Sequence, residues 1–166
     1  MEPPLTAYSE HETERLTVRP LCSAVSAALQ RLTDDPAITS RIIFLSSPFT
    51  LADAEALIGR NDRENCFLGV WQNETLIGVV GTHLRGSDQL EIGYWFGTHF
   101  HRRGYATEAV SAILAELRQL YPARQIIAQC KLDNAPSWNL LHKLAFRPAA
   151  EQGDRPGRVL LMLGDS

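Results

Sequence analysis

The sequence lacks the long apolar runs that would let a helix cross a membrane. Its longest apolar stretches, at residues 76–80 and 159–163, fall far short of the roughly 20 residues that a bilayer span requires. The N-terminus also lacks a basic stretch followed by an apolar segment, and it carries Glu2, Pro3 and Pro4 instead. It therefore does not match a secretory signal, and we expect a cytoplasmic protein with no membrane partner.

Cysteine is scarce as well. Cys22, Cys66 and Cys130 are odd in number, widely spaced and free of the short Cys/His spacings that hold zinc. We expect reduced thiols in the core and no metal site. Three histidines without ligand-spaced partners are predicted to be surface or loop residues: His83, His99 and His142.

An excess of positive charge is absent too. The 166 residues contain 16 Lys and Arg against 19 Asp and Glu, a net charge of -3, which argues against non-specific binding to nucleic acid or anionic lipid. With 45% hydrophobic and 21% charged residues, the chain is long enough and apolar enough for one globular domain. Residues 1–14 carry four Glu and two Pro and predict a flexible leader, which leaves a single domain over residues 15–166.

The pattern along the chain predicts an α+β fold. Alternating or β-rich stretches indicate strands near 16–18, 67–71, 76–81, 90–96, 126–130 and 158–163, and helical spacing indicates helices near 24–32, 51–58, 106–120 and 136–144. Short turns make the middle strands an antiparallel meander. The helix between residues 90–96 and 126–130 implies that these two strands are parallel within a mixed sheet.

The segment after the strand at residues 90–96 carries the strongest chemical signal. Gly104 has no Cβ to block a ligand, and the helix that begins near Tyr105 offers unpaired backbone N–H groups. Arg102 and Arg103 add two cations, so the segment is suited to a diphosphate. A solvated basic turn with a glycine bend explains the same residues. The P-loop, complete dinucleotide-binding and zinc-protease motifs are absent.

Two motifs resemble the GCN5-related N-acetyltransferase family. His101, Gly104 and Ala106 occupy the fixed positions of its Q/R-x-x-G-x-G/A signature, with His101 replacing the usual Gln or Arg. The second motif is similar to N-x-x-S…L-x-K-L-G-F of the ribosomal-protein acetyltransferase branch, with Ala145 in place of Gly; it consists of Asn134, Ser137, Leu141, Lys143, Leu144 and Phe146. Residues 15–20 are similar to that branch's first strand, so the resemblance spans about residues 15–163.

This resemblance implies a mostly antiparallel sheet flanked by about four helices, with a parallel strand pair splayed around acetyl-CoA. It also implies direct transfer of acetyl from acetyl-CoA to a primary amine without a metal. The residues expected to bind the cosubstrate are Tyr94, Trp95, Phe96, His101, Arg102, Arg103, Gly104, Tyr105, Ala106, Thr107, Asn134 and Ser137.

Two residues are candidates for catalysis. The amine must lose a proton, and Glu91, in the strand before the phosphate loop, is the candidate base. The departing thiolate needs a donor; because Leu141 occupies the place of the family's usual tyrosine, the resemblance assigns this role to Ser137. Ordinary alternatives are an exposed strand carboxylate for Glu91, an early-helix hydroxyl for Ser137 and simple helix capping by Asn134.

The acceptor is expected to be the N-terminal α-amine of a protein or peptide. Its binding wall is predicted over residues 33–60, with cation-attracting acids that suit a basic peptide or a polyamine: Asp34, Asp35, Glu55 and Asp62. A small-molecule amine, such as an amino acid, polyamine or aminoglycoside, is the alternative acceptor, and a non-catalytic acyl-CoA-binding module is the alternative class. Homodimers are frequent in this branch, but the sequence indicates no interface.

Overall fold

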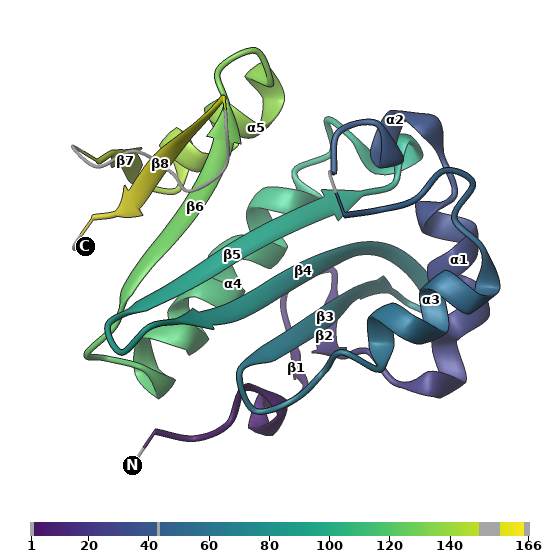
Figure 1. Cartoon of the computed structure of the whole chain (residues 1–166), viewed down its shortest axis with the longest axis horizontal. Helices are drawn as coiled ribbons and strands as arrows, with labels where there is room; N and C mark the ends of the chain where they lie inside the picture. Colours follow the sequence, from purple (N-terminus) through teal and green to yellow (C-terminus); the bar gives the residue numbers. More distant parts are fainter. Residues whose placement is uncertain (1, 43, 150–156, 165–166) are drawn as a thin grey trace.

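The computed structural model describes residues 2–42, 44–149 and 157–164 (Figure 1). Within them one eight-stranded sheet has the order β1-β2-β3-β4-β5-β6-β8-β7. The strands are β1 (His11–Glu12), β2 (Thr17–Pro20), β3 (Asn65–Gln72), β4 (Thr75–Arg85), β5 (Gln89–Phe96), β6 (Gln125–Lys131), β7 (Phe146–Pro148) and β8 (Arg158–Leu163). Only β5 and β6 pair in parallel among the described strands, as the intervening helix predicts.

Helices cover both faces of the sheet (Figure 1). They are α1 (Ser26–Thr33), α2 (Pro36–Thr39), α3 (Leu51–Ile58), α4 (Tyr105–Leu120) and α5 (Ala135–Lys143), with short 3-10 turns at Leu5–Ala7, Ser23–Val25 and Thr98–Phe100. The strand alternation sends successive side chains to opposite faces. Leu90 and Ile92 of β5 therefore face the core under α4, whereas Trp95 joins the core that contains α1 and α3.

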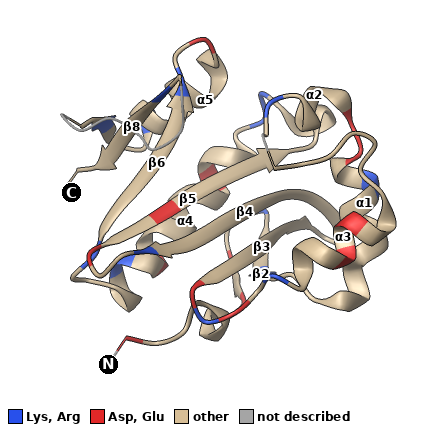
Figure 2. Cartoon of the chain, viewed as in Figure 1, with Lys and Arg blue, Asp and Glu red and all other residues tan. Residues whose placement is uncertain are grey.

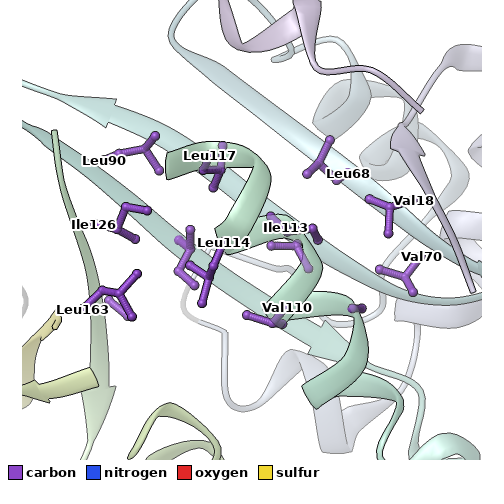
Figure 3. Packing of buried hydrophobic residues seen from close by; sticks show 14 of the residues in the cluster. Val18, Leu68, Val70, Leu90, Val110, Ile113, Leu114, Leu117, Ile126 and Leu163 are labelled. Atoms are coloured by element: carbon purple, nitrogen blue, oxygen red, sulfur yellow. The ribbon is translucent and has the colours of Figure 1, made fainter. Parts of the chain in front are cut away.

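The long amphipathic helix α4 supplies one side of the larger core (Figure 3). Val110, Ile113, Leu114 and Leu117 recur at helical spacing and are buried, as predicted. They pack on apolar side chains of the sheet, including those of Leu90, Ile126 and Leu163. The helix α3 has the predicted bounds and the predicted start, since Thr50 and Asp53 form a reciprocal capping box.

The N-terminal residues differ from the expected flexible leader. Leu5 and Tyr8 are only 1% and 4% exposed and belong to the core under α4. The hydroxyl of Tyr121 donates to the Pro3 carbonyl at 2.6 Å, and β1 adds an edge strand to the sheet. Two apolar side chains at turn spacing were enough to anchor a segment whose overall composition is polar. The burial of those two side chains offsets the conformational entropy that the polar N-terminal segment loses when it becomes ordered.

Other differences are smaller. The short elements β1, β7 and α2 were not predicted, because each has at most four residues and shows no periodic pattern. Cys66 and Cys130 are buried, but Cys22 is exposed, so the expectation of three core thiols is wrong for Cys22. Gly153 and Gly157 predict a turn before the last strand, and residues 153–156 of this turn lie outside the described residues. No helix in the part of the chain that the structure describes is long and apolar enough to span a membrane.

The central feature for function is the separation of β5 from β6. Their ladder runs only from Gln89 paired with Gln125 to Ile92 paired with Ala128. Beyond that point β5 continues to Phe96, whereas β6 diverges toward α5 and pairs with β8 (Figure 1). A parallel pair that opens in this way leaves backbone and side chains of both strands available to a ligand.

Candidate active site

A cavity of about 90 Å³ lies where β5 and β6 separate. The sheet strands β3, β4 and β5 supply one wall, including Phe67, Gly81 and Glu91. The other walls come from β6, α5, the start of β8 and the segment after α2. Elements that are far apart in sequence thus converge on one small space, which is the usual setting of a ligand site.

Glu91 lies on the wall of this cavity and is only 3% exposed. The guanidinium of Arg85 donates from Nε to Glu91 Oε1 at 3.0 Å. A buried carboxylate needs such a partner, because an unpaired charge would be strongly disfavoured there. Glu91 is therefore not an exposed strand carboxylate. Glu91 lies close to the splay point, which is the place where β5 and β6 separate. It is one residue before Ile92, the last residue of β5 that pairs with β6.

His83 lies beside Glu91, because these two residues are paired across β4 and β5. It is 9% exposed and lines the cavity, so the expectation of a surface or loop histidine is wrong. The Asn65 Oδ1 atom accepts from His83 Nδ1 at 2.9 Å, which in a neutral imidazole leaves Nε2 unprotonated. His83 belongs to no motif. The one signal in the sequence was that His83 lies two residues after Gly81 in β4, which places both residues on the same face of the strand.

Ser137 lines the same cavity from α5. Its hydroxyl oxygen is 2.9 Å from the hydroxyl oxygen of Tyr94, and either group can donate. Burial raises the pKa of Tyr94, so its hydroxyl remains neutral. Asn134 caps α5 by accepting from the backbone N–H of Ser137, and it also accepts from the Arg41 guanidinium at 3.2 Å. Five predicted site residues therefore line one cavity: Glu91, Tyr94, Trp95, Asn134 and Ser137.

The predicted phosphate loop precedes α4. Gly104 is the N-cap residue with φ of +78°, a conformation that glycine adopts without strain. The first-turn N–H groups of Tyr105, Ala106 and Thr107 have no intrahelical acceptor by the geometry of a helix start. Arg102 and Arg103 are exposed beside them. The arrangement fits the pyrophosphate of acetyl-CoA, since free N–H groups and a positive helix end attract anions.

The side chains of several predicted cosubstrate residues contact other parts of the protein and are not free to contact acetyl-CoA. Tyr105 is buried beneath the Arg15 guanidinium, and its hydroxyl accepts from Gln72 at 2.7 Å. Phe96 belongs to the core over Gly78, where an added Cβ would lie only 2.3 Å from its ring. His101 is exposed and donates from Nε2 to the Phe96 carbonyl. These side chains support the loop, so any cosubstrate contact of Tyr105 would come from its backbone.

Trp95 sits on the opposite sheet face from Phe96. It is buried, and its indole N–H donates to the Thr33 hydroxyl at 3.1 Å. Its ring borders the cavity together with the neighbouring aromatic side chain of Phe44, at a ring distance of 6.1 Å. Trp95 therefore faces the α1 and α3 side of the cavity, away from the core under α4.

The acids predicted to attract a cationic acceptor lie elsewhere. Asp34 accepts from the backbone N–H of Phe49, and Asp35 caps α2. Asp62 accepts from the backbone of the following turn, and Glu55 is exposed on α3. None of these four is among the described residues that line the cavity. The segment after α2 contributes Arg41, Ile42 and Phe44 to the wall instead.

Among the described residues, no group of three or more His, Cys, Asp or Glu side chains could hold a metal ion. Cys130 borders the cavity, but burial raises the pKa of its thiol, which disfavours a reactive thiolate. Besides amides and the guanidinium groups of Arg41 and Arg158, the polar groups at the cavity include a carboxylate, an imidazole and hydroxyls, which are suited to moving protons.

Comparison with known proteins agrees with this arrangement. Residues 15–147 match the family described as "Acetyltransferase (GNAT) domain". An uncharacterized N-acetyltransferase of Bacillus subtilis, YnaD, is 31% identical over 139 residues, covering 81% of each chain. A GNAT-family acetyltransferase from Bacillus anthracis has a similar structure, with a TM-score of 0.80 and 23% identity over 93% of this chain and 98% of that one. RimJ of Mycobacterium smegmatis, in complex with CoA-disulfide, gives a TM-score of 0.81 at 16% identity over 98% and 90%.

Proposed function

The chain belongs to the GNAT family of acetyl-CoA-dependent N-acetyltransferases, and we propose that it acetylates the α-amine at the N-terminus of a peptide or protein. The observation that carries the proposal is the convergence of Glu91 from β5 and Ser137 from α5 on one cavity at the splay point. A proton acceptor and a hydroxyl donor that line one small space are the two groups that direct acyl transfer needs.

The roles follow from the chemistry of each partner. Acetyl-CoA supplies an acetyl group activated as a thioester. The neutral amine nitrogen forms the new C–N bond, the C–S bond breaks, and the nitrogen gives up one proton. Glu91 accepts that proton, directly or through a water molecule, and the hydrogen bond from Arg85 Nε orients its carboxylate. Ser137 donates a hydrogen bond to the departing sulfur, with Tyr94 supporting the hydroxyl.

The cosubstrate is held at a distance from this chemistry. Its pyrophosphate is suited to the N-terminus of α4, where Gly104 allows the backbone to approach and Arg102 and Arg103 add charge. The opening between β5 and β6 gives the pantetheine arm a path to the cavity, and Asn134 lies on that path.

The size of the cavity is compatible with a terminal α-amine as acceptor. A volume of about 90 Å³ accommodates the reacting amine and its nearest substituents. One protein of similar structure, RimL, is described as a ribosomal L7/L12 alpha-N-protein acetyltransferase, which is consistent with a protein acceptor. A free small-molecule amine fits the same volume and is the second candidate acceptor.

The test is mass spectrometry of a mixed acceptor panel incubated with the protein and acetyl-CoA. The panel contains N-terminal peptides, free amino acids, polyamines and aminoglycosides. We expect the mass of one acetyl group on peptide α-amines. Acetylation of small amines alone would replace the proposed acceptor class, and no transfer to any amine would contradict the enzymatic proposal.

Glu91→Gln is the matching variant for the proposed base. We expect it to lower kcat by about 10²- to 10⁴-fold, the usual size of general-base catalysis, and to flatten the pH-rate profile. Its KM for acetyl-CoA should remain close to the wild-type value. Glu74→Gln is the control, because it makes the same change from a carboxylate to an amide at an exposed residue in the turn between β3 and β4. An unchanged rate and pH profile for Glu91→Gln would show that another group accepts the proton.

A further inference from the structure

The charges around the cavity differ from the charge of the whole chain. Among the described residues that line it, Glu91 is the one acidic side chain, and its charge is matched by Arg85. Arg41 and Arg158 line it as well, so the cavity is positive although the protein has a net charge of -3. A local excess of positive charge on an acidic protein indicates that the cavity is suited to binding an anionic group.

The two arginines come from distant parts of the chain and meet at the cavity. Arg158 begins β8 and donates from Nη2 to the Arg41 carbonyl at 3.4 Å. Arg41 follows α2 and donates from Nη1 to Asn134 Oδ1 at 3.2 Å, beside the start of α5. Figure 2 shows positive residues at the start of β8, beside β6 and α5. The contact with Asn134 uses one of several guanidinium donors, so Arg41 can bind another acceptor atom.

We propose that the acceptor is an amine that carries a carboxylate close to its nitrogen, with the carboxylate bound by Arg41 and Arg158 and the amine directed toward Glu91. The proposal rests on the acetyl transfer proposed above and narrows its substrate class. Planar guanidinium groups bind carboxylates through paired hydrogen bonds, which gives both attraction and orientation. Glu91 on β5 and the arginines on other elements can then bind the two oppositely charged ends of one acceptor.

The same charges oppose a cationic acceptor. A polyamine or a peptide that begins with lysines would place additional positive charge beside two arginines. Nearby cations also favour the neutral form of the acceptor's own amine, which is the form that reacts. The arginines thus assist the reactive amine while requiring a compensating carboxylate elsewhere in the acceptor.

Two sources could supply that carboxylate: the α-carboxylate of a free amino acid, or acidic side chains near the start of a peptide. The first arm of the experiment compares free amino acids with their amides. The second arm compares three peptides of one length that begin with alanine and continue with two aspartates, two asparagines or two lysines. Rates are measured as kcat/KM with acetyl-CoA saturating and at low ionic strength, where charge effects are largest.

We expect at least one carboxylate-bearing acceptor to exceed its neutral or lysine counterpart by about tenfold, which corresponds to about 1.4 kcal/mol. The double variant Arg41→Glu/Arg158→Glu should reduce this preference at least tenfold, while KM for acetyl-CoA stays within about twofold. Arg41→Gln/Arg158→Gln, which removes charge without reversing it, should give an intermediate loss. Arg63→Glu makes the same charge change at an exposed position that does not line the cavity, and it should leave the preference intact.

The proposal is wrong if neither arm shows a preference for the carboxylate-bearing acceptor, or if the arginine variants leave the preference unchanged. It is also wrong if these variants mainly raise KM for acetyl-CoA, because the arginines would then bind the cosubstrate.

Failure of the proposed acetyl transfer can be distinguished from failure of the proposed carboxylate site. If no amine is acetylated, acetyl transfer fails as the proposed function, and the charge preference is tested by binding. Titration calorimetry then compares N-acetylated aspartate and asparagine peptides in the presence of CoA. Tighter binding of the aspartate peptide that depends on both arginines would support the anionic site, and equal binding would overturn it.

Discussion

The hydroxyl oxygens of Tyr94 and Ser137 lie 2.9 Å apart and connect β5 to α5 beyond the last paired residues of β5 and β6. Tyr94 is half-buried, and Ser137 is in the first turn of α5. The contact is thus a side-chain link across the part of the sheet where backbone pairing has ended. It fixes the orientation of the Ser137 hydroxyl at the cavity wall.

Ser137→Ala tests the proposed donor to the leaving thiolate. We expect kcat to fall by about tenfold, the effect of losing one hydrogen bond of about 1.4 kcal/mol in the transition state, with a small change in KM for acetyl-CoA. Steady-state kinetics with both substrates measure this. Ser111→Ala, an exposed serine on α4, controls for the loss of a helix hydroxyl. Unchanged turnover and acetyl-CoA affinity in Ser137→Ala would remove Ser137 from both catalysis and binding.

Gly104→Ala tests the loop before α4. An alanine at φ of +78° costs about 1–2 kcal/mol, and its Cβ would lie 3.3 Å from Arg15 Nη2. The backbone must shift where the N–H groups face the pyrophosphate, so KM for acetyl-CoA should rise several-fold. Gly157→Ala has nearly the same φ of +74° with nothing within 4 Å of the added Cβ, and it should cost stability alone. Equal KM values for acetyl-CoA in the two variants would show that Gly104 does not contribute to cosubstrate binding.

Glu108→Gln tests the acidic residue in the first turn of α4. Partial burial raises the pKa of Glu108, but hydrogen bonds from Thr13 and from the backbone and guanidinium of Arg15 outweigh it and hold the pKa below its ordinary value. The resulting stability is present above the unfolded-state pKa, near 4.3, and is lost as the pH falls through the folded-state pKa. Urea unfolding should show a loss of about 1–2 kcal/mol at pH 7 that shrinks toward pH 3.

The matching control is Glu55→Gln, an exposed residue on α3. Its free energy of unfolding should stay within about 0.5 kcal/mol of the wild-type value at both pH values. A loss for Glu108→Gln that is the same at pH 7 and pH 3 would show that the charge of Glu108 does not contribute.

Leu5→Ala tests the packing of the N-terminal residues. Leu5 is 1% exposed, so removal of its side chain should lower the free energy of unfolding by about 2–4 kcal/mol. Leu51→Ala makes the same chemical change at a position that is 48% exposed and should change stability by less than about 1 kcal/mol. Thermal and urea unfolding measure both. If the two variants were equally stable, residues 1–14 would behave as the leader that their composition suggested.

Local patterns in the sequence determined most of the fold. The apolar spacing of α4, the capping box at Thr50 and Asp53, and the turn between β3 and β4 each depend on neighbours within a few residues. The parallel pairing of β5 and β6 follows because a helix connects them and crossovers of this kind are strongly constrained. The motifs around Gly104 and Ser137 also indicated the family and its cosubstrate, because both are short and local.

Only the tertiary structure decided which residues surround the cavity. Leu5 and Tyr8 became core residues because α4 and the sheet offered an apolar surface that composition does not reveal. His83 reached the cavity through its register opposite Glu91, and Arg41 met Arg158 across 117 positions of sequence. The acids expected to attract a cation cap helices and turns instead. Such contacts depend on strand register and on the path of distant segments, so no local pattern encodes them. The sequence therefore indicated the chemistry, and the fold decided the charge of the cavity.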